Sequence, residues 1–402
     1  MPSLLAPDFL SQQQLDNLKL YKYAAIDRSF TTKYVLRHYW NAVIELFPLW
    51  MAPNLITLIG LLFMIINVVF AVVFTPDMDG EGPRWIYFSF AAGMWLYSTF
   101  DNVDGKQARR TGTSSPLGEL FDHGCDALNC SFAAVLQAAG IGLGHSLAAV
   151  TLYAIAMLGF YLSTAEEYHT GVLYLGYVNA PTEGVILTCV LFIISGLYGP
   201  SVYARPVSYY LPQLTLYLPS SIVSLSVSHA LIGWIGLMAL FTHLPVCFYA
   251  MYKACRKNNK PFLRTMLIQN MPIAVYSIAF LSWVLSPYSS ILSHHHFILY
   301  AITTGIVFGR IASKIILAHL TKSRFPRFTV LLIPLIVGAV ISNLPRLNAI
   351  EPIFTPESEY LYICGFFVFS LLAYLRWAVV VINSFCNYLG INCLTIPKRK
   401  SL

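Results

Sequence analysis

Ten apolar stretches, separated by shorter polar segments, set the pattern of this chain. A helix of about 20 apolar residues is long enough to cross a bilayer. The stretches lie at about 55–75, 84–104, 117–141, 145–165, 182–198, 224–251, 266–286, 296–319, 328–344 and 359–386. The pattern therefore predicts an all-α integral membrane protein with about ten transmembrane helices.

The segment before the first apolar stretch has a different periodicity. Between Thr31 and Pro48, apolar and aromatic residues recur at roughly helical spacing among charged and polar ones. These residues are Tyr34, Val35, His38, Trp40, Ile44 and Phe47. The spacing predicts an amphipathic helix that lies in the plane of the lipid headgroups.

Composition excludes a soluble protein, and the basic residues predict an orientation. Of the 402 residues, 57% are hydrophobic and 11% are charged, which is less than half the usual charged share. If both chain ends are cytosolic, most basic residues fall on that side, as the positive-inside rule requires. They are Lys19, Lys22, Arg28, Lys33, Arg37, Lys106, Arg109, Arg110, Lys253, Arg256, Lys257, Lys260, Arg264, Lys322, Arg324, Arg327, Lys398, Arg399 and Lys400. The net charge of +7 thus reflects topology first and attraction to anionic lipid second, and a nucleic-acid partner is not expected.

Four aspartates between the second and third apolar stretches are the strongest chemical signal in the chain. Asp101 and Asp104 precede a turn rich in Gly, Ser and Pro, and Asp122 and Asp126 follow it. Residues three or four apart share one face of a helix, so a short connection would let the two pairs face each other. Carboxylates in a membrane segment are candidates for function, and four together need cations between them. The spacing predicts a site for Mg²⁺ or another hard cation, of the kind used in two-metal phosphoryl transfer.

The same stretch resembles the signature of a known enzyme family. Asp101-x-x-Asp104-Gly105-x-x-Ala108-Arg109, an eight-residue spacer, and Gly118-x-x-x-Asp122-x-x-x-Asp126 match the DxxDGxxAR…GxxxDxxxD pattern of the CDP-alcohol phosphotransferases. The words DGKQARRT, SPLGELFDHG and LWMAPNLIT resemble the eukaryotic choline/ethanolamine phosphotransferase branch. The resemblance runs over most of the chain and is weakest in its C-terminal half.

The resemblance implies a reaction, its cofactors and its partners. The reaction is transfer of phosphocholine or phosphoethanolamine from CDP-choline or CDP-ethanolamine to diacylglycerol, with release of CMP. Two Mg²⁺ or Mn²⁺ ions would be held by the four aspartates, and the protein is expected to be a homodimer. The residues expected at the nucleotide are Asn54, Gly105, Ala108, Arg109, Gly118 and Glu119.

The division of the chain follows from this reading. Residues 1–52 form a cytosolic and interfacial segment, and 53–200 form the catalytic helices. Residues 201–390 supply further transmembrane helices that form a lipid chamber or a dimer interface, and 391–402 are a cytosolic tail.

Two residues compete for the role of the base that takes the proton of the acceptor hydroxyl. Asp126 is favoured by the family resemblance, but a metal-bound carboxylate is a poor base. Histidine is a side chain suited to proton transfer near neutral pH, and Glu119 lies four residues before His123, where it could orient the imidazole. We favour His123 and keep Asp126 as the alternative. Further along, Glu166, Glu167 and Tyr168 form a candidate pocket for the ammonium group.

The C-terminal sequence KRKSL is similar to a dilysine retrieval signal, which predicts the membrane of the endoplasmic reticulum or the Golgi, with both termini and the site cytosolic. Two other functions stay open. One is a CDP-alcohol phosphotransferase with a different acceptor, and the other is a cation-coupled transporter, against which the absence of an inverted repeat in the sequence argues.

Overall fold

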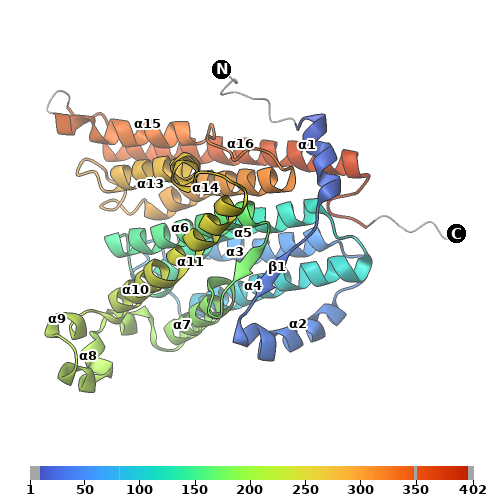
Figure 1. The fold of residues 1–402 in the computed structure, drawn as a ribbon. Coiled ribbons are helices and arrows are strands. Elements are labelled where there is room, and N and C mark those ends of the chain that lie inside the picture. The colour runs from blue at the N-terminus through green and yellow to red at the C-terminus, as the bar shows by residue number, and fades with distance from the viewer. Residues whose placement is uncertain (1–9, 81, 348–350, 397–402) are drawn as a thin grey trace.

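Long antiparallel helices form the body of the molecule. The computed structural model describes residues 10–80, 82–347 and 351–396 (Figure 1). The longer helices are α3 (Pro53–Phe74), α4 (Trp85–Thr111), α5 (Pro116–Gly140), α6 (Leu147–Thr170), α7 (Val185–Tyr198), α10 (Val227–Met238), α11 (Leu244–Lys257), α13 (Met271–Val284), α14 (Phe297–Leu320), α15 (Leu332–Asn343) and α16 (Pro356–Leu389). The shorter elements are α1 (Gln12–Asn17), α2 (Arg37–Val43), α8 (Val207–Tyr210), α9 (Ser220–Val223), α12 (Phe262–Gln269), the helical turns η1 (Leu18–Leu20), η2 (Thr32–Leu36), η3 (Ile44–Leu46), η4 (Ala180–Gly184), η5 (Pro200–Ala204), η6 (Pro212–Leu216), η7 (Ala239–His243) and η8 (Leu344–Leu347), and the strands β1 (Ala25–Asp27) and β2 (Leu173–Leu175).

The helices confirm an all-α membrane protein. In the described ranges, six helices are long and apolar enough to cross a membrane, or seven if α12 and α13, which are bent by 44°, form one span. Each of the ten predicted apolar stretches overlaps a helix. However, α4 and α5, which carry the aspartates, are not among the six, and α15 is shorter. The number of ten spans therefore stays a prediction.

Helix α14 forms the centre of the bundle and packs directly against α5. It is the most deeply buried of the membrane-length helices, and α5, α6 and α16 surround it. Small residues permit the close approach: a Cβ on Gly305 would collide with Ser131 of α5, and one on Gly309 would collide with Leu128. Ser131 and its neighbours Ala134 and Ala138 are almost fully buried. These small residues therefore allow α5 and α14 to pack closely.

A tight turn sets the two aspartate helices side by side. Helix α4 continues about two turns past the predicted end at residue 104, as far as Thr111. Arg109 and Arg110 lie in its last turn, where their positive charges interact favourably with the negative end of the helix dipole. Gly112 ends the helix in the left-handed conformation, with φ of 68°. The Ser115 side chain then caps α5, which begins at Pro116, a residue favoured in the first turn of a helix.

The N-terminal segment is helical where a helix was predicted at 31–48. However, the residues that it buries are only partly those of the predicted apolar face. η2, α2 and η3 run continuously from Thr32 to Leu46. Leu36, Trp40 and Ile44 are buried against Val103 of α4, whereas the outer residues Tyr34 and Val35 are exposed. The position of this helix at a membrane surface stays a prediction.

Two polar side chains near the end of α4 hold this segment in place. Arg110 donates to the carbonyl of Ile44 at 2.9 Å, and Gln107 donates to that of Met51 at 3.0 Å. Because both donors lie on the aspartate helix, the N-terminal segment is fixed directly to the element that carries the site.

Besides two isolated β-bridges, the described residues contain one short parallel pair of strands. β1 pairs with β2, with Ala25 opposite Leu173. Because β2 directly follows α6, the pairing brings the N-terminal segment to the end of that helix, beside the aspartate helices (Figure 1).

Candidate active site

Three of the four predicted metal ligands converge on one point. Carboxylate oxygens of Asp101, Asp122 and Asp126 all lie within 4.8 Å of one another. Asp104 stands next to them and accepts a hydrogen bond from Thr57 of α3. Every pair among the four carboxylates interacts electrostatically. The two-helix arrangement predicted from the spacing thus brings the aspartates together.

The donor set fits a divalent metal ion. The Oδ1 atom of Asp122 is buried and has no hydrogen-bond partner in the described part of the chain. Carboxylates this close repel one another in a medium of low dielectric constant, and none of them takes part in the ion pairs found there. Oxygen ligands of this kind suit Mg²⁺, Mn²⁺ or Ca²⁺. A cation would both satisfy the buried oxygen and remove the repulsion.

A tyrosine that the sequence analysis did not single out holds one of these carboxylates. The hydroxyl of Tyr97 donates to Asp126 Oδ1, much as Thr57 donates to Asp104. Tyr97 lies four residues before Asp101 and therefore on the same face of α4. That spacing was a signal available in the sequence.

Arg109 offers a charged group beside the carboxylates. Its side chain is exposed and lies over Gly105, with a guanidinium nitrogen 3.5 Å from the position that a Cβ on Gly105 would take. It also interacts electrostatically with Asp104. A guanidinium in this position can bind a phosphate group through its planar fork.

The predicted nucleotide residues include two glycines at which a side chain would not collide with the protein. A Cβ on Gly118 would approach no atom more closely than 3.8 Å, and the nearest is Oδ1 of Asn54. Asn54 is buried, and its amide donates to Cys393 Sγ at 3.7 Å. Ala108 is partly exposed on α4. Helix packing therefore does not require glycine at 105 or 118.

We expect Gly118→Ala to separate ligand binding from folding. Alanine should leave the protein as stable as before, or more stable by about 1 kcal/mol, because alanine favours a helix. The added methyl group should raise KM for the CDP-alcohol by about tenfold. The measurement is initial rate against CDP-alcohol concentration, with thermal unfolding in parallel. Gly124→Ala is the matched control, because Gly124 lies on the same helix with similar free space but faces Ser313; an equal rise in KM for both variants would contradict the assignment.

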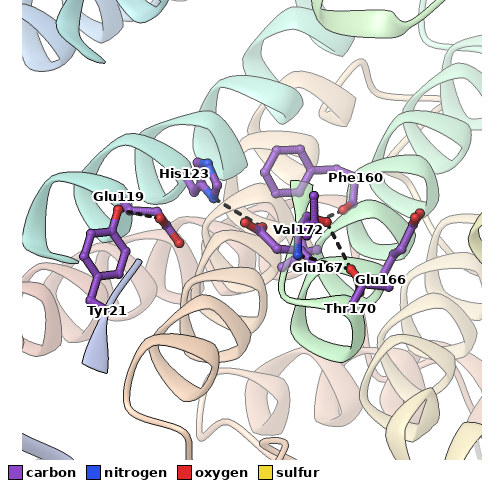
Figure 2. A network of polar contacts seen from close by, with 9 residues as sticks. Tyr21, Glu119, His123, Phe160, Glu166, Glu167, Thr170 and Val172 are labelled. Carbon is purple, nitrogen blue, oxygen red and sulfur yellow. Dashed lines mark hydrogen bonds and ion pairs between the residues drawn. The ribbon is translucent and has the colours of Figure 1, made fainter. Parts of the chain in front are cut away.

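His123 is paired with a glutamate from a different helix than expected. Nδ1 of His123 lies 3.5 Å from Oε2 of Glu167, and both side chains are nearly buried. Figure 2 shows the pair bridging α5 and α6. Glu119, the carboxylate predicted to orient His123, interacts with it electrostatically and also accepts a hydrogen bond from the Tyr21 hydroxyl, 2.7 Å from Oε2 (Figure 2). Glu167 reaches His123 because α6 packs along α5, a tertiary contact that spacing within one helix does not reveal.

The contact made by Tyr21 is one of several by which residues 14–21 bind to the helix ends near the site. We call this segment the strap. Burial and the Glu119 carboxylate raise the pKa of Tyr21 well above its usual range, so its hydroxyl stays protonated and acts as donor. Upstream, Asn17 donates to the carbonyl of Thr321 and Gln14 donates to Ser323, each at 2.8 Å. The strap therefore runs from the end of α14 to α5, next to the carboxylate cluster. The sequence analysis left this segment without a role.

The predicted ammonium pocket at Glu166–Tyr168 does not form as one group. Glu167 faces His123, while Glu166 points away from it (Figure 2) and is hydrogen-bonded to Cys247 of α11. The hydroxyl of Tyr168 donates to the carbonyl of Ser323 at 2.8 Å. Successive residues on a helix point about 100° apart, so these three side chains serve three different contacts.

Together, these features define a class of site: a carboxylate cluster in a helical membrane protein, able to hold a divalent cation beside a guanidinium and a histidine–glutamate pair. Comparison with known proteins identifies the family. The family model for CDP-alcohol phosphatidyltransferase matches residues 50–211, which include all four aspartates. The chain belongs to this family.

Named relatives are similar over nearly the whole chain. Choline/ethanolaminephosphotransferase 1 of Saccharomyces cerevisiae is 34% identical, over 98% of this chain and 99% of its own. Choline/ethanolaminephosphotransferase 1 of Arabidopsis thaliana is 33% identical, over 96% of this chain and 97% of its own. Cholinephosphotransferase 1 of Saccharomyces cerevisiae is 37% identical, over 79% of this chain and 80% of its own. The likeness therefore extends well beyond the aspartate helices into the C-terminal helices.

Proposed function

We propose that the protein transfers phosphocholine, phosphoethanolamine or both from the CDP-alcohol to the free hydroxyl of diacylglycerol. The products are phosphatidylcholine or phosphatidylethanolamine and CMP. The observation that carries this proposal is the convergence of the family's aspartates in a chain that matches choline/ethanolaminephosphotransferases from end to end. A membrane-embedded site also suits an acceptor that is itself a lipid.

The donor would be bound at the carboxylate cluster. Asp101, Asp104, Asp122 and Asp126 are proposed to hold two Mg²⁺ or Mn²⁺ ions, which when bound neutralise the attacked phosphate and the CMP leaving group. Arg109 would pair with a phosphate oxygen through its exposed guanidinium.

The nucleoside would occupy the space at the predicted nucleotide residues. Gly105, Ala108 and Gly118 leave room for cytidine and ribose, with Asn54 at the wall of this space. Glu119 is also proposed to lie beside the nucleotide. Its hydrogen bond from Tyr21 would hold the strap next to the bound nucleotide.

His123 is proposed as the base, with Asp126 as the alternative. Glu167 faces Nδ1 and would hold the proton there, so that the lone pair of Nε2 is free to take the hydroxyl proton. The acceptor oxygen then forms a bond to phosphorus as the bond from phosphorus to the CMP oxygen breaks. Asp126 is less suited to this role, because it belongs to the carboxylate cluster and already accepts from Tyr97.

We further propose a ten-span protein of the endoplasmic reticulum or Golgi membrane with both termini and the site in the cytosol. The helix order supports this, because ten alternating spans bring the ends of α4, α6, α11 and α14 to the face where the basic loops lie. The retrieval signal at 398–402 lies outside the described residues. The homodimer rests on the family resemblance alone.

The test is a donor comparison with purified protein in detergent, diacylglycerol and Mg²⁺. CMP release and phospholipid formation are measured with CDP-choline or CDP-ethanolamine, with and without a chelator. We expect equal amounts of CMP and phospholipid, lost on chelation, and the ratio of rates gives the headgroup preference. CMP release that depends on a different acceptor alcohol would instead assign the protein to another activity in its family.

A further inference from the structure

A basic surface lies next to the end of α6 and has no part in the proposed reaction. It consists of six exposed side chains from the end of α11, α12 and the loop after α14: Arg256, Lys257, Lys260, Arg264, Arg324 and Arg327. The sequence contains no aspartate or glutamate between Glu183 and Glu351. The three ion pairs within the described residues lie elsewhere and include none of the six. The positive charge of this basic surface is therefore not balanced within its own part of the chain.

Helix α12 has the form of an element that lies in a membrane surface. It is bent by 44° from α13, which is apolar enough to continue across the membrane. Leu263 and Leu267, one turn apart, expose 71% and 68% of their surface, and Arg264 and Lys260 flank them. Apolar side chains pointing outward among basic ones are typical of a helix at the boundary between headgroups and acyl chains. The chemistry that complements this surface is an anionic headgroup with an acyl tail.

Both parts of the basic surface contact the C-terminal part of α6, and each makes one contact with its last turn. At the end of α12, Gln269 accepts from Tyr161 through its carbonyl at 2.6 Å and contacts His169 through its side chain at 2.5 Å. In the loop after α14, the carbonyl of Ser323 accepts from Tyr168 at 2.8 Å. Glu167, the partner of His123, lies between these contacts in the sequence. A ligand that fixes the basic surface therefore also fixes the end of the helix that orients His123.

We propose that the basic surface binds anionic phospholipid of the surrounding leaflet, and that the bound lipid raises turnover by holding the end of α6 in place. The substrate diacylglycerol is uncharged, and the proposed products carry no net charge, so neither competes for this surface by charge. The activity part of the inference rests on the proposed function, whereas lipid binding does not.

The experiment uses the full-length protein in nanodiscs of phosphatidylcholine alone or with about one-fifth phosphatidylserine. Native mass spectrometry counts the phosphatidylserine molecules retained, and CMP release gives turnover in the same discs. We expect retained phosphatidylserine and a several-fold rise in turnover, with both reduced by high salt. Lys257→Gln/Lys260→Gln/Arg264→Gln should lose both effects and keep the turnover of the unaltered protein in phosphatidylcholine discs.

The matched control removes three charges from the opposite end of the helices, with Arg84→Gln/Arg205→Gln/Arg346→Gln. This variant should retain phosphatidylserine and its stimulation. Equal lipid retention by the two triple variants would overturn the proposal, as would retention without any change in turnover. Two further results would also overturn the proposal. One is stimulation of the detergent-solubilised protein by inorganic phosphate, and the other is a raised KM for the CDP-alcohol in Lys257→Gln/Lys260→Gln/Arg264→Gln. Either result would mean that the basic surface binds a soluble anion. If no disc shows any turnover, the proposed function fails, while the lipid count still tests the binding site.

Discussion

Asp122→Asn is expected to lower CMP release by about a thousandfold or more, because a metal clamp contributes several kcal/mol to phosphoryl transfer. Asparagine keeps the size of the side chain but removes the charge that would hold a cation. Asp122 is the strongest choice among the four aspartates, because its buried Oδ1 has no hydrogen-bond partner among the described residues. Asp104 and Asp126 accept from Thr57 and Tyr97, and Asp101 accepts from the side chain of Asn102 at 3.5 Å.

The measurement should include thermal unfolding with and without Mg²⁺. A ligand that binds only the folded state raises its stability, so the unaltered protein should melt at a higher temperature with Mg²⁺. Asp122→Asn should lose this shift while remaining folded. Glu351→Gln, which removes an exposed carboxylate outside both groups of side chains that could hold a metal ion, should keep both the shift and the activity. A Mg²⁺ shift of the same size in Asp122→Asn would show that the cluster is not the metal site.

The sequence was sufficient to predict the helices and the aspartate cluster, for one physical reason. Both depend on local spacing: apolar length defines a membrane helix, and residues three or four apart on each side of a short turn must share a face. Asp101 and Asp122 meet because Gly112 and Pro116 allow α5 to fold back directly along α4.

What could not be predicted depends on which faces of distant helices meet. Glu166 and Glu167 are the same type of residue, yet only Glu167 faces His123, because the rotation of α6 against α5 is set by packing over their whole length. The strap was missed for a similar reason. The bond from Tyr21 to Glu119 joins residues 98 apart in the sequence, and no periodicity connects them.

The contact between His123 and Glu167 leads to a second prediction, which distinguishes the role of Glu167 from that of Glu119. His123→Gln should lower kcat by about a hundredfold to ten-thousandfold, the usual range for a general base, and leave KM for the CDP-alcohol nearly unchanged. Glu167→Gln should lower kcat in the same way but by less, because the amide can still contact Nδ1 without stabilising its proton.

The double variant should be no slower than His123→Gln alone, since an orienting group has no effect once its partner is removed. Glu119→Gln is the decisive control, because this carboxylate lies on the same helix as His123 but is bound by Tyr21. It should affect kcat less than Glu167→Gln does. If Glu119→Gln instead reproduces the loss and Glu167→Gln does not, His123 is oriented within its own helix. If His123→Gln turns over at the normal rate, the proton goes to Asp126, and the contact between His123 and Glu167 serves only to join α5 to α6.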